Sequence, residues 1–371
     1  MSSISVNTIT DASGGSTTSI NGFTPSVSNM AGRNRIINGG MRIDQRNAGA
    51  SITPNSSFTL DRWLFTNTQT SKVNIQQSSV APSGFSNSLL VTSTSSYSVA
   101  AGDTFLITQR IEGFNVADLA WGSANAKPIT ISFWVRSSLT GTSGGALINS
   151  ADNRNYVFSY TINSSDTWEY KTVTIAGDTS GTWLTGNNRG ISVRFGLGSG
   201  STFSGAVGAW SSSNYVQPTG SFSVVGTSGA TFYVTGVQLE AGSVATPFEH
   251  RQYGQELALC QRYYQSLDFN SGSFMTTGVA FSSTAAAGGI RFLQAMRATP
   301  TVTLPPAGQS TGTISFLNTS SYPTATGSNT ADNINNQGFR VNGSGYTGLA
   351  SGGPAWLYNS GAVSILVSAE L

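Results

Sequence analysis

The most regular feature of this sequence is a series of short segments in which apolar and polar residues alternate. In residues 130–137 ("TISFWVRS"), Ile131, Phe133 and Val135 occupy every second position. An alternation with a period of two is typical of antiparallel strands that bury one face. About nine such segments, separated by turn residues, lie between residues 61 and 248. The pattern predicts a jelly-roll β-sandwich over residues 33–248.

Residues 249–267 break this alternation and have the spacing of a helix. The apolar positions Tyr253, Leu257, Cys260, Tyr264 and Leu267 are separated by 4, 3, 4 and 3 residues, which is the spacing of a coiled-coil seam. Two heptads do not sustain an isolated coil in water. We therefore predict a short linking helix whose apolar seam packs around the axis of a homotrimer. The alternative is an amphipathic helix that packs on its own sandwich.

The two ends of the chain differ from the sandwich and from each other. Residues 1–32 are polar and turn-rich, with too few apolar side chains for a core. They predict either an extended N-terminal arm along a neighbouring molecule or a disordered tail. Residues 268–371 return to short strand-like segments. They predict a second, smaller C-terminal β domain, so the expected fold class is all-β with one short helix.

The composition supports this fold class and excludes several kinds of function. Of 371 residues, 43 are glycine and only 9% are charged, which disfavours a helix-rich fold because the polar residues present are poor helix formers. The net charge of +2 is too small and scattered to indicate nucleic-acid binding. No apolar segment approaches the length of a membrane span. The single cysteine, Cys260, excludes an intramolecular disulfide and a multi-cysteine metal site.

Two longer stretches resemble the sequences of bacteriophage tail-fibre and receptor-binding proteins. The first is residues 34–49, "NRIINGGMRIDQRNAG", which is followed by "FTLDRW". The second is residues 232–265, "FYVTGVQLEAGSVATPFEHRQYGQELALCQRYYQ". The resemblance covers residues 34–265, and Asp44 stands where the family usually has an aromatic residue. It implies a β-sandwich similar to carbohydrate-binding modules, in a trimeric structural protein of the virion.

The resemblance also implies partners and a location. Residues 1–32 would attach to other virion proteins, and residues 268–371 would point outward to bind a polysaccharide of the host surface. The start of the sequence has no basic and apolar leader, so we expect synthesis in the host cytoplasm and release within the particle. The alternatives are a capsid-decorating knob protein of the phage head and a polysaccharide depolymerase. We expect neither enzymatic activity, nor a cofactor or metal ion, nor membrane insertion.

Sugar binding needs exposed aromatic faces for stacking beside polar groups for the hydroxyls. Aromatic residues in stretches rich in glycine, serine and asparagine are therefore candidate glycan-binding residues, namely Trp121, Trp183, Trp210, Tyr215, Trp356 and Tyr358. The alternative is that such tryptophans close the ends of a sandwich and belong to its core.

Residues 33–46 concentrate positive charge in a chain with little charge. Four arginines lie there: Arg33, Arg35, Arg42 and Arg46. Because guanidinium groups form bidentate pairs with carboxylates, we predict that they lock the joint between arm and sandwich. The candidate partners are Asp44, Asp61 and Glu240.

Few residues could support catalysis. His250 is the only histidine, and no nucleophile motif lies near it in the sequence. Asp166 and Glu169 are the nearest approach to the two carboxylates of a glycoside hydrolase. Asp152 and Asn153 could offer oxygens to calcium, without the full pattern of a calcium loop. We therefore expect no catalytic residue and no metal ligand.

Overall fold

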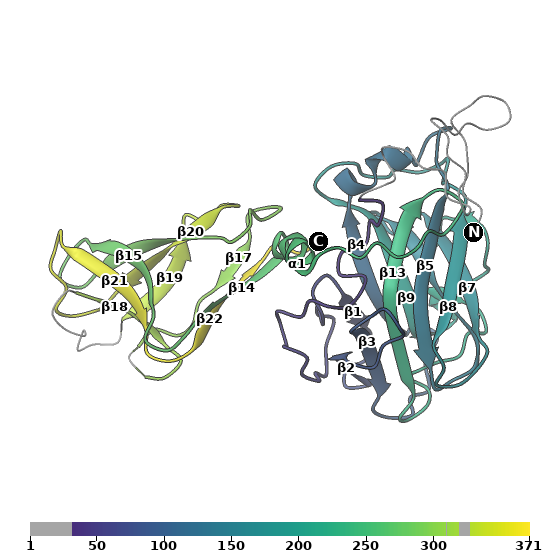
Figure 1. Ribbon diagram of the computed structural model, residues 1–371, viewed down its shortest axis with the longest axis horizontal. Helices are drawn as coiled ribbons and strands as arrows, with labels where there is room; N and C mark the ends of the chain where they lie inside the picture. Colours follow the sequence, from purple (N-terminus) through teal and green to yellow (C-terminus); the bar gives the residue numbers. More distant parts are fainter. Residues whose placement is uncertain (1–31, 309, 319–326) are drawn as a thin grey trace, which may run out of the picture. The chain divides into compact units, whose positions relative to one another are not determined.

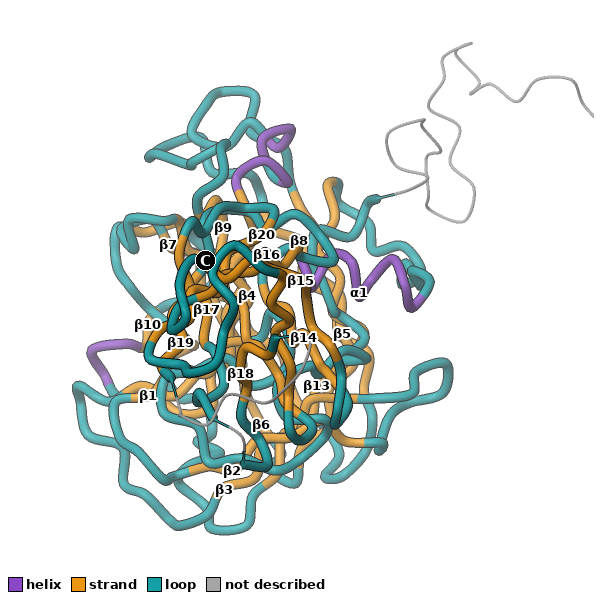
Figure 2. The backbone as a smooth tube through the Cα atoms, turned by 90° about the vertical axis from the view of Figure 1, so that its left-hand side faces the viewer, coloured by secondary structure: helices purple, strands orange, loops and turns teal. Residues whose placement is uncertain are grey.

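The computed structural model describes residues 32–308, 310–318 and 327–371, and the chain divides into two compact units, Met1–Gln252 and Tyr253–Leu371. The predicted N-terminal arm, apart from Gly32, lies outside the described residues. Regular structure is almost entirely strand, and helix is confined to a few short segments (Figure 2). The prediction of an all-β fold is thus confirmed. Within the described residues no helix is long and apolar enough to cross a bilayer.

The first unit is a jelly-roll sandwich of two antiparallel sheets, as predicted (Figure 1). The six-stranded sheet has the order β1 (Leu64–Asn67), β4 (Thr104–Glu112), β9 (Arg189–Ser199), β6 (Gly141–Asn149), β7 (Asn155–Ile162) and β11 (Trp210–Ser211). The five-stranded sheet has the order β2 (Val73–Ser78), β3 (Ser88–Ser93), β13 (Thr231–Ala241), β5 (Ile129–Ser137) and β8 (Glu169–Ile175). Short connecting elements are η1 (Gly113–Asn115), η2 (Ala117–Leu119), η3 (Ser201–Phe203), β10 (Ser204–Gly205) and β12 (Gln217–Pro218).

The core lies between the inner faces of the two sheets. Ile131, Phe133 and Val135 of β5 are fully buried, as their alternation predicts. The ring of Phe133 meets the ring of Phe195, from β9 in the opposite sheet, edge to face at 5.0 Å between centroids. Burial of large apolar side chains from both sheets supplies the main stabilisation of the sandwich.

Two asparagines help to hold residues 32–43, the leading segment, in place: Asn34 bonds to β13, and Asn38 bonds to residues before β1. The side chain of Asn34 accepts a bond from Leu239 N at 3.1 Å and donates to Val237 O at 3.2 Å. Asn38 is fully buried, and its backbone oxygen accepts the indole N–H of Trp63 at 3.0 Å. These bonds satisfy backbone groups that the chain would otherwise bury without partners.

The four arginines of this region make contacts of different kinds. Arg33 donates to Pro247 O at 2.8 Å, and Arg35 pairs with Asp118 at 2.8 Å. The guanidinium of Arg46 lies 5.1 Å from the ring centre of Phe58, and Arg42 is exposed.

The predicted carboxylate partners of the arginines are wrong for Asp44 and Glu240. The carboxylate of Asp44 accepts the backbone N–H groups of its own loop, and that of Glu240 bonds to Thr246. Short local bonds of this kind compete well with long arginine side chains, which lose more entropy on pairing.

The second unit contains two further antiparallel sheets. One has the order β14 (Tyr264–Phe269), β22 (Val363–Ser368) and β17 (Thr301–Thr303). The other has the order β18 (Ile314–Leu317), β21 (Pro354–Asn359), β15 (Phe274–Ala280), β16 (Ala286–Arg291), β20 (Gly338–Ser344) and β19 (Ser328–Asp332). Its own core includes Phe316, Tyr346, Leu357 and Ile365, all fully buried.

The predicted helix over residues 249–267 is shorter than expected. Helix α1 spans Tyr253–Gln261 and belongs to the second unit. Tyr264 and Leu267 lie on β14, where they pair with Ser368 and Ile365 of β22. Cys260 is fully buried, whereas Tyr253 is 52% exposed. The five residues therefore do not form one helical seam. Tyr264 and Leu267 instead lie in a strand that pairs with β22, about a hundred residues later in the sequence.

Candidate functional site

Three of the predicted glycan-binding tryptophans form a cluster at the end of the sandwich. Trp121, Trp183 and Trp210, here called the tryptophan cluster, meet edge to face with centroid distances of 4.7, 5.2 and 5.4 Å. Trp121 and Trp183 are only 8% and 9% exposed. The prediction that these two offer stacking faces is wrong, and the alternative of a closed sandwich end describes them.

The indole N–H groups of the tryptophan cluster are all satisfied inside the protein. Trp121 donates to Lys127 O at 2.8 Å and Trp210 to Ala176 O at 2.9 Å. Trp183 donates to the buried carboxylate of Asp178 at 3.3 Å. Arg154 clamps the same carboxylate with Nε at 2.8 Å and Nη2 at 2.5 Å. The arrangement is that of a rigid structural corner.

Tyr215 also packs within the first unit. Its half-buried ring lies over Gly205, where a Cβ atom would come within 2.3 Å of the ring. Its backbone oxygen accepts a bond from Asn155 Nδ2 at 2.8 Å. Its neighbours Asn214 and Val216, rather than Tyr215 itself, reach the pocket described below.

The remaining two predicted residues lie together on an outer face of the second unit. Along β21 the side chains of Ala355, Leu357 and Asn359 are buried, whereas Trp356 and Tyr358 are partly exposed. Phe274 of β15 is 64% exposed and pairs in register with Tyr358. Its ring centroid is 6.0 Å from that of Trp356 and 5.8 Å from that of Tyr358. We call Phe274, Trp356 and Tyr358 the aromatic platform.

The aromatic platform combines exposed aromatic surface with polar groups. Three rings on neighbouring strands present apolar faces and edges, and Trp356 and Tyr358 each add a polar group for a sugar hydroxyl. Sequence reasoning did not select Phe274, because the register that sets it opposite Tyr358 joins strands about eighty residues apart. Its place in a strand-like segment was visible, but its partner was not.

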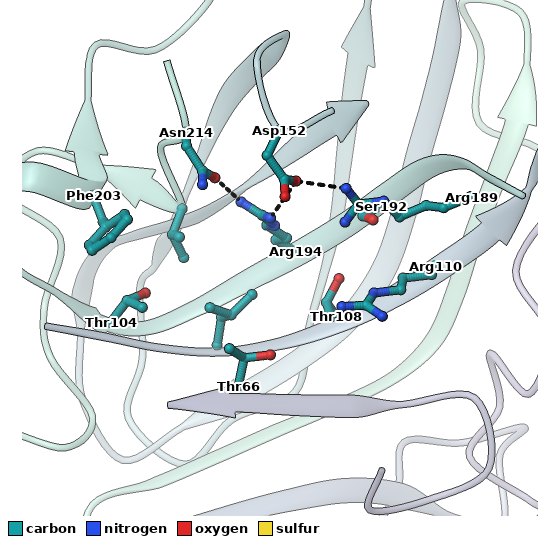
Figure 3. Close-up of a pocket in the computed structure, with 12 residues that line it drawn as sticks. Thr66, Thr104, Thr108, Arg110, Asp152, Arg189, Ser192, Arg194, Phe203 and Asn214 are labelled. Carbon is teal, nitrogen blue, oxygen red and sulfur yellow. Dashed lines mark hydrogen bonds and ion pairs between the residues drawn. The ribbon is translucent and has the colours of Figure 1, made fainter. Parts of the chain in front are cut away.

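A second candidate site is a pocket of about 220 Å³ on the outer face of the six-stranded sheet (Figure 3). Its floor comes from β4 and β9, where Thr108 stands directly opposite Arg194 and Arg110 opposite Ser192. The segment that crosses this face supplies Phe203, Asn214 and Val216. We call this the arginine pocket. Its full lining is Thr66, Thr104, Leu106, Thr108, Arg110, Asp152, Arg189, Ser192, Arg194, Phe203, Asn214 and Val216.

Glycines allow the crossing segment to lie close to the sheet. A Cβ on Gly144 would come within 2.4 Å of Pro218, and one on Gly196 within 2.3 Å of Gln217. With glycine at these positions the segment can approach strands β6 and β9 directly. The wall of the arginine pocket is thereby held at a fixed distance from its floor.

The lining of the arginine pocket contains three arginines and one carboxylate. Asp152 Oδ1 accepts from Arg189 Nη2 at 2.9 Å and from Arg194 Nη2 at 3.2 Å (Figure 3). Arg194 Nη1 also donates to Asn214 Oδ1 at 2.6 Å. Burial, above all, lowers the pKa of Arg194 to about 10; Asp152 acts to raise it, and Arg189 and Arg110 lower it further. One carboxylate thus faces three guanidinium groups.

Asp152 and Asn153, the candidate calcium ligands, have partners within the protein. The carboxylate of Asp152 binds two arginines, and Asn153 Oδ1 accepts from Asn149 Nδ2 at 2.9 Å. Within the described ranges no group of three or more histidine, cysteine, aspartate or glutamate residues could hold a metal ion. The cations at this turn are guanidinium groups of the chain itself.

The candidate catalytic residues have structural contacts. The ring of His250 packs against the rings of Phe85 and Phe248, with centroid distances of 5.2 and 4.9 Å. Glu169 accepts from Lys171 Nζ at 2.6 Å, and Asp166 pairs with Arg136 at 3.3 Å. Burial alone would raise the pKa of Glu169, but hydrogen bonds from Lys171 and the 163–164 turn lower it to about 2. A carboxylate with so low a pKa stays ionised at neutral pH and cannot act as a general acid.

The pKa of Glu169 predicts an acid-dependent loss of stability. Its folded-state pKa of about 2 lies below the ordinary value of 4.5, so its contribution is complete above about pH 4.5 and is lost as the pH falls towards 2. We expect the difference in unfolding free energy between the native chain and Glu169→Gln to shrink over that range. Chemical denaturation at several pH values measures it, and a difference that grows on acidification would contradict the assignment.

Comparisons with known proteins add a likeness of fold. No protein-family model matches the chain, and no curated protein matches it. Solved structures are similar to it in part. An enzymatically active domain of tailspike protein 4 from bacteriophage CBA120 is 13% identical over 56% of this chain, with a TM-score of 0.32. The match spans only 21% of that tailspike chain.

Two further similar structures are matched over their whole length. A putative sugar binding protein from Bacteroides thetaiotaomicron is 12% identical, with 57% of this chain and 100% of that chain covered and a TM-score of 0.34. A family 11 carbohydrate-binding module of a Clostridium thermocellum cellulase is 14% identical, with coverage of 56% and 100% and a TM-score of 0.26. Identities and TM-scores this low carry no argument about what the chain does.

Proposed function

We propose that the chain is a structural adhesin of a bacteriophage particle, a tail fibre or a similar appendage, that binds a glycan on the host surface. The assignment to a virion is supported by the resemblance of residues 34–49 and 232–265 to phage tail-fibre sequences. The two stretches come together in space, because Asn34 and Gly39 of the first bond to the backbone of β13 in the second. The resemblance therefore covers one structural joint rather than two unrelated segments.

The observation that carries glycan binding is the aromatic platform. A ring as exposed as that of Phe274, at 64%, is costly to leave in water, and a neighbouring tryptophan and tyrosine extend its surface. Saccharides offer apolar ring faces that stack on such rings and hydroxyl groups that bond to their polar atoms. The account needs binding without turnover, so we propose no enzymatic role.

We further propose that the chain acts as a homotrimer, so that three weak sites bind one surface together. Linked sites gain avidity whenever the geometry allows simultaneous binding. The support is the sequence resemblance, because α1 does not supply the coiled-coil seam first expected. Sedimentation of the full chain at micromolar concentration tests it; a folded species of one copy would contradict the trimer without affecting the aromatic platform.

Binding of the full chain to a panel of immobilised bacterial surface polysaccharides tests the platform. We expect at least one glycan to bind, and Trp356→Ala and Phe274→Ala each to weaken that binding by about tenfold or more, equivalent to roughly 1.4 kcal/mol. Phe281→Ala is the matched control, since Phe281 is 56% exposed in the same unit but lies outside the platform. Equal loss in all three variants, or no loss in the platform variants, would overturn the proposal.

A further inference from the structure

The arginine pocket differs from the aromatic platform in that its lining is rich in positive charge. It lies in the first unit, and its lining includes Arg110, Arg189 and Arg194 but only one carboxylate, Asp152. Guanidinium groups that surround a partly buried space favour an anion, because its charge offsets their mutual repulsion where water screens little. The hydrogen bonds of Arg194 to Asn214 and Asp152 use two of the five N–H groups of its guanidinium.

The pocket also contains a buried hydroxyl that faces no partner. Ser192 is 1% exposed, lines the pocket, and its Oγ makes no hydrogen bond among the described residues. A buried polar atom of this kind costs free energy unless a ligand or water completes it. Thr108 Oγ1 donates to Val193 O at 2.9 Å, which leaves its lone pairs as acceptors towards the pocket.

The other side of the pocket has a different character. Figure 3 places the ring of Phe203 away from Arg110 and Arg189, and Arg194 lies between them. A pocket that combines arginines, hydroxyl groups and one aromatic ring suits a molecule that is anionic, hydroxylated and partly apolar. Its volume of about 220 Å³ leaves room for one sugar residue.

We propose that the arginine pocket binds a sugar residue that carries an acid group, a carboxylate or a sulfate, within an acidic polysaccharide. The acid group lies against Arg189 and Arg194, the hydroxyls against Ser192 and Thr108, and the apolar ring face against Phe203. The inference goes beyond the proposed function because it concerns a different unit and a defined class of ligand. It stands or falls independently of the aromatic platform.

Calorimetric titration of the full chain tests the inference with paired probes. Oligosaccharides of galacturonate, glucuronate and guluronate, sialyllactose and a sulfated galactan oligomer are each compared with the methyl-esterified, asialo or desulfated counterpart. Inorganic sulfate serves as the anion alone. We expect at least one acidic probe to bind about tenfold or more tightly than its neutral counterpart and than sulfate, consistent with a hydrogen bond to a charged group.

Variants of the pocket locate that binding. Arg189→Gln is expected to weaken binding of the acidic probe by about tenfold. Ser192→Ala, which removes no described hydrogen bond, is expected to weaken it about fivefold with unchanged thermal stability. Arg136→Gln is the matched control, because Arg136 pairs with Asp166 outside the pocket. Trp356→Ala should leave this affinity unchanged.

Several outcomes would overturn the inference. Equal affinity for an acidic oligosaccharide and its neutral counterpart would show that the pocket does not recognise the acid group. Equal affinity for an acidic oligosaccharide and inorganic sulfate would show that it does not recognise the sugar. Absence of binding by every acidic probe at millimolar concentration would reject the site, as would full affinity in Arg189→Gln. If only Trp356→Ala lost binding, the acidic ligand would bind at the aromatic platform and not in the arginine pocket.

Discussion

Replacement of Gly39 by alanine is expected to lower the unfolding free energy of the first unit by about 3 kcal/mol or more. A Cβ at this position would lie 2.1 Å from the backbone oxygen of Val237. The strand cannot simply move away, because Val237 N also donates to Gly39 O at 3.0 Å. For a unit of this size the midpoint of thermal unfolding should fall by roughly 10 °C. Differential scanning calorimetry measures the shift.

The next residue provides the matched control for this prediction. A Cβ on Gly40 would have its nearest neighbours, in Arg42 and Phe248, at 3.8 Å, an ordinary van der Waals distance. Gly40→Ala should therefore change the unfolding free energy by less than about 1 kcal/mol. Similar unfolding midpoints for the two variants would show that the leading segment does not lie against β13 as described.

Substitution of Asp178 by asparagine is expected to cost the first unit about 3 kcal/mol. Its carboxylate is 1% exposed and holds Arg154, Ser180 N and Trp183 together. Removal of the charge leaves the guanidinium of Arg154 in a partly buried place without its counter-ion. The change should also alter the intrinsic fluorescence of the tryptophan cluster, because it removes the negative charge beside the indole N–H of Trp183. Denaturant titration followed by fluorescence measures both effects.

Asp166→Asn separates this effect from a general loss of charge. Asp166 forms a single, longer ion pair with Arg136 at 3.3 Å, and its side chain is 52% exposed. Exposed pairs contribute little in water, so the substitution should change the unfolding free energy by less than about 0.5 kcal/mol. A loss in Asp178→Asn no larger than in this control would contradict the structural role of the tryptophan cluster.

The sandwich could be predicted from the sequence because its strands carry a strong local signal. The alternation in residues 130–137 matches β5, whose odd-numbered residues are fully buried. The region of the linking helix shows where a local pattern is not sufficient to predict the structure. Residues 264–269 fit a helical spacing and a strand pattern alike, and the pairing of Tyr264 with Ser368 decides between them. A contact across a hundred residues leaves no trace in a local window.

The candidate sites were less predictable than the fold. Trp356 and Tyr358 were found because their polar loop context indicated exposure, and both lie on an outer face. Trp121 and Trp183 have a similar context, yet they pack against each other. The arginine pocket had no sequence signal, because Arg110, Asp152 and Arg194 come from separate elements that meet only in the folded sheet.

The two stretches that resemble phage proteins have a common structural meaning. Asn34 and Asn38 saturate buried backbone groups, Gly39 permits close approach to Val237, and Glu249 accepts the N–H groups of Gly32 and Asn34 at 2.7 Å. The joint needs these residue types on both sides. Arg251, which the sequence analysis did not select, also takes part in the joint and donates to Ile36 O at 3.0 Å.

A crystal structure of the full chain with the tightest-binding neutral oligosaccharide from the panel tests glycan binding at the aromatic platform most directly. The account predicts a sugar ring stacked on Phe274 or Trp356, within contact of Tyr358. Density for the sugar over the tryptophan cluster, or only in a place remote from β15 and β21, would contradict it.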